Sequence, residues 1–79
     1  MWTLKYTQEA QSYFIDNDPY TFQVLVKCEE LKHYHGGIPE TGCTQIDDGL
    51  LWWEVLDQAV IFERIEAKQQ IIIVAIKPI

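Results

Sequence analysis

The 79-residue sequence predicts one α+β domain over residues 1–79, with a helical hairpin packed on one face of a twisted, mainly antiparallel four-stranded sheet. Three observations predict this fold. Apolar and polar residues alternate at the start of the chain, and short apolar segments follow one another near its end, as strands do. Between them, apolar residues recur at spacings of three and four, which is typical of helices. Hydrophobic residues make up 48% of the sequence, which indicates a packed core and argues against disorder.

The first strand is expected over residues 2–6, because apolar side chains alternate there with polar ones. The apolar positions are Trp2, Leu4 and Tyr6. Thr7 can cap a first helix by accepting a hydrogen bond from a backbone amide of the first turn. This helix is expected to end near Asn17, because Pro19 disfavours helical geometry in the residue before it. Its apolar face consists of Ala10, Tyr13 and Phe14.

The second helix is expected to begin at Asp18-Pro19, with the aspartate as cap and the proline in the first turn. Its apolar stripe consists of Val24, Leu25, Cys28 and Leu31. Phe22 and Val26 widen that stripe, which predicts a helix covered on more than one side. Gly36-Gly37 is expected to end the helix and is not a phosphate-binding loop, because no helix begins after it.

A loop is expected over residues 38–48, with turn residues at Asp47-Asp48-Gly49. Three strand candidates follow, at 50–56, 59–65 and 71–77. Asp57-Gln58 fits a short hairpin connection between the first two of them. The final strand is apolar on both faces, which predicts a central position or a covering helix. The first strand of the chain is expected to lie beside it.

Charge and cysteine content restrict the class of protein. The net charge is −6, from twelve acidic residues against five lysines and one arginine. Phosphate backbones are bound mainly by Lys and Arg, so we expect no direct nucleic-acid binding. The start MWTLKYT is not a signal peptide and no apolar run is long enough for a membrane helix, so a cytoplasmic protein is expected. Cys28 and Cys43 could form a disulfide, but two free thiols fit that compartment better.

The order strand, helix, helix, strand, strand, strand resembles the RelE/ParE superfamily of bacterial toxins from type II toxin–antitoxin systems. The resemblance covers nearly the whole chain. It is carried by the opening strand and capped helix (Trp2 to Ala10), the helical hairpin, the segments Asp48-Gly49-Leu50 and Asp57 to Glu63, and the last strand (Ile71 to Lys77). The resemblance implies an antitoxin as partner.

The sequence departs from the family where the family carries its basic residues. Aligned on Asp57, the usual arginine of the next strand is Ala59. The preceding strand, which usually carries one or two arginines, here reads Leu51, Trp52, Trp53 and Glu54. The last strand ends in residues 76–79, IKPI, instead of His-Arg or a tyrosine. RelE-like members cut messenger RNA in the ribosome with basic side chains, so these departures predict a domain that keeps the fold and lacks that chemistry.

The weak catalytic candidates are His33, His35, Arg64 and Lys77. Either histidine could serve as a general base near neutral pH. His33 and His35 with Cys43 could also bind zinc, but the spacing fits no zinc pattern, so ordinary helix-end histidines are favoured. We expect no metal and no cofactor. Glu54, Glu63 and Glu66 could act as acid and base, although carboxylates on strands are usually solvent-facing.

Trp52 and Trp53 are the best candidates for a partner contact. Neighbouring residues on a strand point to opposite faces, so one tryptophan is expected under the helices and the other on the open face of the sheet. With Phe62, the exposed one could form an aromatic patch that binds a partner; cover by a loop or by the C-terminal tail is an equal alternative.

The sequence therefore favours a RelE/ParE-like protein that is catalytically degenerate and binds a protein partner, either an antitoxin or a second copy of itself. An active ribosome-dependent endoribonuclease and a gyrase-inhibiting ParE-like toxin are the alternatives. An enzyme is the less favoured reading.

Overall fold

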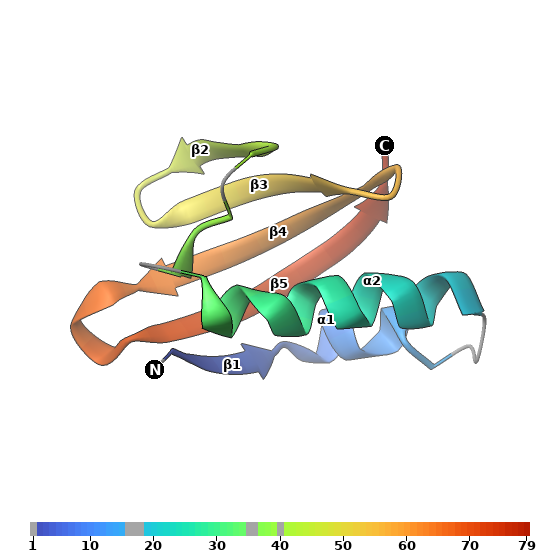
Figure 1. The fold of residues 1–79 in the computed structure, drawn as a ribbon, viewed down its shortest axis with the longest axis horizontal. Helices are drawn as coiled ribbons and strands as arrows, with labels where there is room; N and C mark the ends of the chain where they lie inside the picture. The colour runs from blue at the N-terminus through green and yellow to red at the C-terminus, as the bar shows by residue number, and fades with distance from the viewer. Residues whose placement is uncertain (1, 16–18, 35–36, 40) are drawn as a thin grey trace.

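The computed structural model describes residues 2–15, 19–34, 37–39 and 41–79 (Figure 1). The strands are β1 (Thr3–Tyr6), β2 (Cys43–Asp47), β3 (Leu50–Val55), β4 (Gln58–Ile65) and β5 (Gln70–Pro78). The helices are α1 (Gln8–Tyr13) and α2 (Pro19–Glu30), with short 3₁₀ turns η1 (Leu31–His33) and η3 (Glu66–Lys68). Two of the predicted turn and cap residues, Asp18 and Gly36, lie outside the described residues.

The strands form one sheet in the order β1-β5-β4-β3-β2. β1 pairs in parallel with β5, from Thr3 beside Gln70 to Tyr6 beside Ile73. All other neighbours in the sheet are antiparallel. The expectation that the first strand lies beside the last is therefore confirmed, and β5 is a central strand, as its two apolar faces predicted.

The sheet has five strands, so the predicted number of four is wrong. The missed strand is β2, which lies within the segment expected to be a loop and pairs with β3 through the turn at Asp48 and Gly49. Gly49 has a φ of 74°, which suits glycine. β2 is almost entirely exposed, so no apolar alternation marked it in the sequence; its backbone pairing with β3 and the Asp-Gly turn form it instead.

The β3–β4 hairpin also turns one residue earlier than predicted. Its two turn residues are Leu56 and Asp57, with φ values of 49° and 65°, and Val55 pairs with Gln58. Two consecutive positive φ values are characteristic of a type I′ turn, which matches the twist of the flanking strands. Leucine is an uncommon residue in this conformation, which is why the sequence did not indicate the position.

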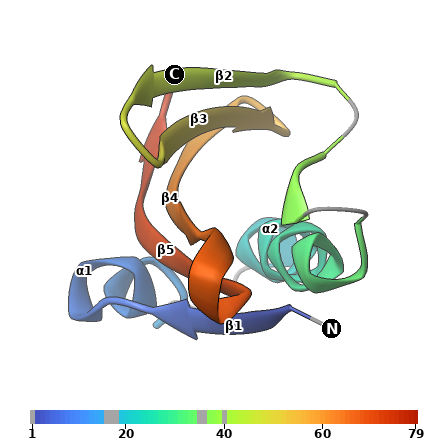
Figure 2. The ribbon, with the colours of Figure 1, turned by 90° about the vertical axis from the view of Figure 1, so that its left-hand side faces the viewer.

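The two helices lie in different places relative to the sheet. Figure 2 shows the sheet curving around α2, whereas α1 lies beside β1 and β5. Thr7 fixes α1 there, because its backbone N–H donates to the Ile73 carbonyl at 3.0 Å and its hydroxyl donates to the Val74 carbonyl at 2.6 Å. Thr7 also accepts a hydrogen bond from the Ala10 N–H, as predicted for the cap. Only α2 covers the concave face, so the prediction of both helices packed as a hairpin on one face of the sheet is wrong.

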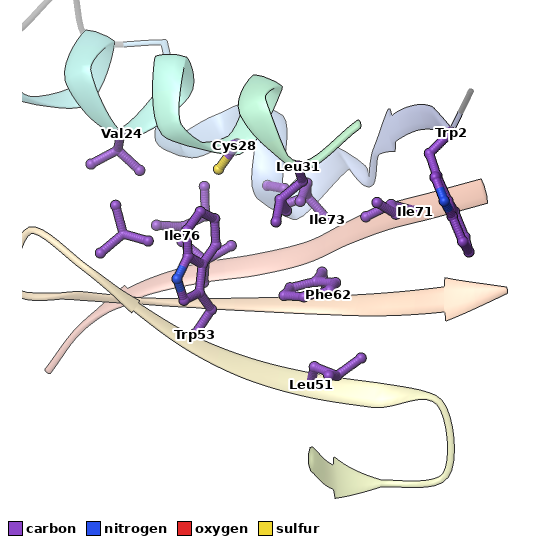
Figure 3. Packing of buried hydrophobic residues seen from close by; sticks show 13 residues of the cluster. Trp2, Val24, Cys28, Leu31, Leu51, Trp53, Phe62, Ile71, Ile73 and Ile76 are labelled. Carbon is purple, nitrogen blue, oxygen red and sulfur yellow. The ribbon is translucent and has the colours of Figure 1, made fainter. Parts of the chain in front are cut away.

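The core lies between α2 and the concave face of the sheet (Figure 3). Val24 and Cys28 of α2 are completely buried, as is Leu31 of η1. They face sheet residues that include Trp53, Phe62, Ile73 and Ile76. The rings of Trp53 and Phe62 meet edge to face, with centroids 6.4 Å apart. This aromatic pair fills the middle of a small core.

Trp2 closes the core at the end where β1 begins. Gly37 has a φ of 69°, and a Cβ added there would lie 2.9 Å from Cδ2 of Trp2. The guanidinium of Arg64 lies over the same indole, with Cζ 4.7 Å from the ring centroid. Glycine is therefore required at position 37 both by backbone conformation and by the approach of Trp2.

A hydrogen-bond network ties β1 to α2. The Tyr6 hydroxyl donates to Oε2 of Glu29 at 2.5 Å, and Lys32 Nζ lies 3.2 Å from Oε1 of the same carboxylate. The hydrogen bond from Tyr6 is the main cause that lowers the pKa of Glu29. Burial raises this pKa, and the contacts with Lys32 lower it further, so that it lies below its usual value. Burial and the bond to Glu29 raise the pKa of Tyr6. Glu29 is therefore held ionised at neutral pH.

The two tryptophans should differ sharply in their effect on stability. Trp53 is 6% exposed in the core, whereas Trp52 is half-buried on the opposite face. We expect Trp53→Ala to lower the free energy of unfolding by about 3–5 kcal/mol. We expect Trp52→Ala to lower it by about 1 kcal/mol. Urea denaturation checks both values, and equal losses would contradict this assignment of the two side chains.

Removing the Tyr6 hydroxyl should make stability less dependent on pH. The folded-state pKa of Glu29 is lowered, so its contribution is present above the unfolded pKa and is lost as pH falls through the folded one. Tyr6→Phe should cost about 1 kcal/mol at pH 7, and this difference from the wild type should shrink in acid. Tyr34→Phe, at a half-buried tyrosine, is the control and should show a constant difference across the same pH range. A Tyr6→Phe difference that does not change with pH would argue against the network.

Candidate functional site

All six Lys and Arg residues lie within the described ranges, so the distribution of positive charge can be followed completely. Three of them are paired with glutamates, as Lys27–Glu30 at 3.7 Å, Lys32–Glu29 at 3.2 Å and Arg64–Glu66 at 3.5 Å. The remaining three are Lys5 on β1, Lys68 on η3 and Lys77 on β5. The six cations are therefore spread over six elements, and half of them have an acidic neighbour.

Arg64 lines a hollow in the surface. It lies on the concave face of β4, and its side chain is only 19% exposed. The hollow beside it has a volume of about 270 Å³. Its lining residues are Ile38, Gln45, Asp48, Gly49, Leu51, Arg64 and Glu66. Arg64 contacts Trp2 and Glu66, and two acids share the hollow with it, so the site offers little net positive charge to a phosphate.

The four weak catalytic candidates do not form one site. Arg64 pairs with Ile71 in the sheet, and Lys77 lies six residues further along β5 on the opposite face, which corresponds to about 20 Å. His33 is exposed at the end of η1. His35 lies outside the described residues. Ala59, at the position where the resemblance led us to look for an arginine, is 6% exposed and faces the convex side beside Lys77.

The carboxylate candidates do not pair with one another either. Glu63 pairs with Leu50 and Glu54 with Ala59, so the two glutamates lie about 13 Å apart along the convex face. Glu66 binds Arg64. An acid and a base acting on one bond must both reach it, and this spacing prevents that.

The cysteine and histidine candidates for a metal site are also dispersed. Cys28 is buried in the core, where burial raises the pKa of its thiol to about 12. Cys43 begins β2, opposite Trp53, and burial raises its pKa as well. Both thiols are free. Within the part of the chain that the structure describes, no group of three His, Cys, Asp or Glu side chains is placed to hold a metal.

Of the proposed partner-binding residues, one is accessible. Trp53 and Phe62 share the concave face and are buried against each other, so Phe62 does not join Trp52 in a patch. Trp52 lies on the convex face, paired with Ile61 of β4, which in turn pairs with Ala75 of β5. Trp52 and Ile61 are partly exposed. The alternation of side chains along β3 and β4 could have predicted that Trp52 lies beside Ile61. It assigns Phe62 to the same face as Trp53, and therefore not to the face of Trp52.

A second apolar surface lies on the outer side of α2. Phe22 is 64% exposed and Val26 is 43% exposed, one helical turn apart. They border a shallow groove of about 410 Å³. Its lining residues are Phe22, Leu25, Val26, Glu29, Glu30, Lys32 and His33. The sequence indicated that these residues widen the apolar stripe, but it did not show that they face away from the core.

The sequence matches no family model and no curated protein. Among the helices that the structure describes, none is long and apolar enough to cross a membrane.

The fold, in contrast, matches a solved structure. The chain superposes on a chain in the crystal structure of the intact RelBE toxin–antitoxin complex from E. coli, with a TM-score of 0.77. The match covers 100% of this chain and 98% of that chain, at 10% sequence identity. At such low identity the likeness concerns the backbone arrangement alone. The chain therefore has a RelE-like toxin fold, as the order of its strands and helices led us to expect.

Proposed function

We propose that this protein is the toxin-fold member of a bacterial, cytoplasmic toxin–antitoxin pair that binds a protein partner and does not cleave RNA. The likeness to a chain of the RelBE toxin–antitoxin complex supports the pairing with an antitoxin. The charge distribution supports the loss of cleavage, and it is the observation that carries the proposal.

Cleavage of a phosphodiester needs positive charge fixed close to the atoms where negative charge develops. Here Lys27, Lys32 and Arg64 are paired with glutamates. Arg64 and Lys77 lie on opposite faces of the sheet. The net charge of −6 adds a field that repels messenger RNA and the ribosomal RNA around it. This arrangement of charges supports neither a phosphate-binding site nor long-range attraction of the protein to RNA.

Binding of a protein partner is supported by the apolar surface that remains. Trp52 and Ile61 form a partly exposed row on the convex face of the sheet. Tryptophan is enriched among residues that dominate protein interfaces. Trp53 and Phe62 support this surface from the buried side and are not themselves contacts in our proposal.

Purified protein should leave messenger RNA intact when incubated with translating ribosomes, because no cluster of cations is available to stabilise the transition state. Primer extension on the transcript measures cleavage, and a ribosome-dependent RelE-like nuclease serves as the positive control. Induced expression should also leave growth unchanged. Reproducible transcript cutting would overturn the proposal, and its loss in Arg64→Ala would then assign the activity to the hollow that Arg64 lines. Growth arrest with loss of gyrase supercoiling activity would instead support a ParE-like toxin.

Trp52 should contribute to binding the product of the neighbouring open reading frame. Trp52→Ala should weaken that complex about tenfold or more, since buried interface tryptophans are often dominant contacts. Ile79→Ala, at an apolar residue that is 63% exposed at the C-terminus, is the control and should bind normally. Isothermal titration calorimetry with the co-expressed and separated proteins measures both affinities. Unchanged binding by Trp52→Ala would remove the convex face from the interface.

A further inference from the structure

α2 has apolar residues on two nearly opposite sides. Val24 and Cys28 face the core and are completely buried. Phe22 and Val26 lie roughly 150° around the helix from them, at 3.6 residues per turn. A surface helix of a small protein normally has one apolar stripe, directed at the core. The second stripe therefore exceeds what the fold itself needs.

The outer stripe is open along most of the helix. Phe22 exposes 64% of its surface, and the shallow groove beside it extends to His33 at the end of η1. From Phe22 to His33 the helical rise corresponds to about 16 Å, or three turns. This length suits a short amphipathic helix that places residues i, i+3 or i+4, and i+7 into a groove.

The charged residues around the groove favour a positively charged binding segment over a negatively charged one. Its lining holds two glutamates, Glu29 and Glu30, against one lysine, Lys32, which pairs with Glu29. Glu29 is additionally fixed by Tyr6, so its negative charge stays at the groove. An acidic segment would meet more carboxylates than ammonium groups there. The net charge of −6 favours the approach of a basic one.

The same charge disfavours a second copy of this chain as the occupant. A symmetric contact buries the same patch of both copies, with residue i of one copy against residue j of the other. Docking two such grooves would bring together two patches that each carry two glutamates and one lysine, between bodies that each carry −6. Like charges opposed in this way cost binding energy.

We infer that the groove formed by Phe22, Leu25, Val26 and Glu29 binds a short amphipathic helix of a partner protein, with leucine-like anchors and a basic flank. The inference rests on the proposed function and adds that the antitoxin segment bound to α2 is positively charged. The partner would thus supply the positive charge that this chain lacks.

A library selection tests the inference without knowledge of the partner. The probe is a display library of 15-residue helices with a fixed leucine stripe and with Lys, Glu or Gln at the polar positions, selected against the full chain. We expect the selected peptides to carry net positive charge. Fluorescence anisotropy should show that Phe22→Ser weakens their binding about tenfold or more. Ile79→Ser is the matched control, because Ile79 is 63% exposed, follows β5 and does not line the groove, and it should bind like the wild type.

Selection of acidic or neutral peptides would overturn the inference, as would basic peptides that bind Phe22→Ser as tightly as the wild type. A dimer of the chain that Phe22→Ser dissociates in analytical ultracentrifugation would assign the groove to a second copy, and would also overturn it. Circular dichroism confirms that the variants are folded. Each result is independent of RNA cleavage, so a failure here is distinguishable from a failure of the proposed function.

Discussion

β5 is the strand on which the rest of the structure depends, because it joins the two halves of the molecule. It pairs with β1 on one side and with β4 on the other, and Ile71 and Ile73 point from it into the core. Thr7 attaches α1 to its edge beyond the end of β1. α2 then covers the concave side of the sheet that β5 organises. The positions of the helices, and so of the groove on α2, follow from this one strand.

The elements with a clear apolar period could be predicted from the sequence, and those held by backbone pairing alone could not. Alternation located β1, the Thr7 cap located the start of α1, and the two apolar faces of β5 indicated its central place. β2 has no buried face, so only the Asp-Gly turn after it could have indicated a hairpin. The turn at Leu56 and Asp57 needs positive φ at residues that rarely adopt it, so its register was one residue off.

The candidate site was less accessible to sequence reasoning, because it depends on where side chains meet. The absence of arginine at position 59 is visible in the sequence, but the pairing of Arg64 with Glu66 and its position over Trp2 are tertiary contacts. The burial of Phe62 beside Trp53 could have been predicted from the alternation of side chains along the two strands of the hairpin. The exposure of Phe22 required knowing which side of α2 faces the sheet. A RelE-like fold at 10% identity shows that this backbone arrangement does not require one particular sequence.

The parallel contact between β1 and β5 also affects when the protein can fold. Thr7 and the carbonyl that accepts its hydroxyl hydrogen bond are 67 residues apart, so β1 can pair only after β5 has been made. Contacts between such distant segments slow folding, because a long loop must close before they form. Until β5 has been made, a nascent chain carries β1 unpaired and α2 without the complete sheet that buries it. β1 can therefore join the sheet only after the intervening helices and strands have been synthesised.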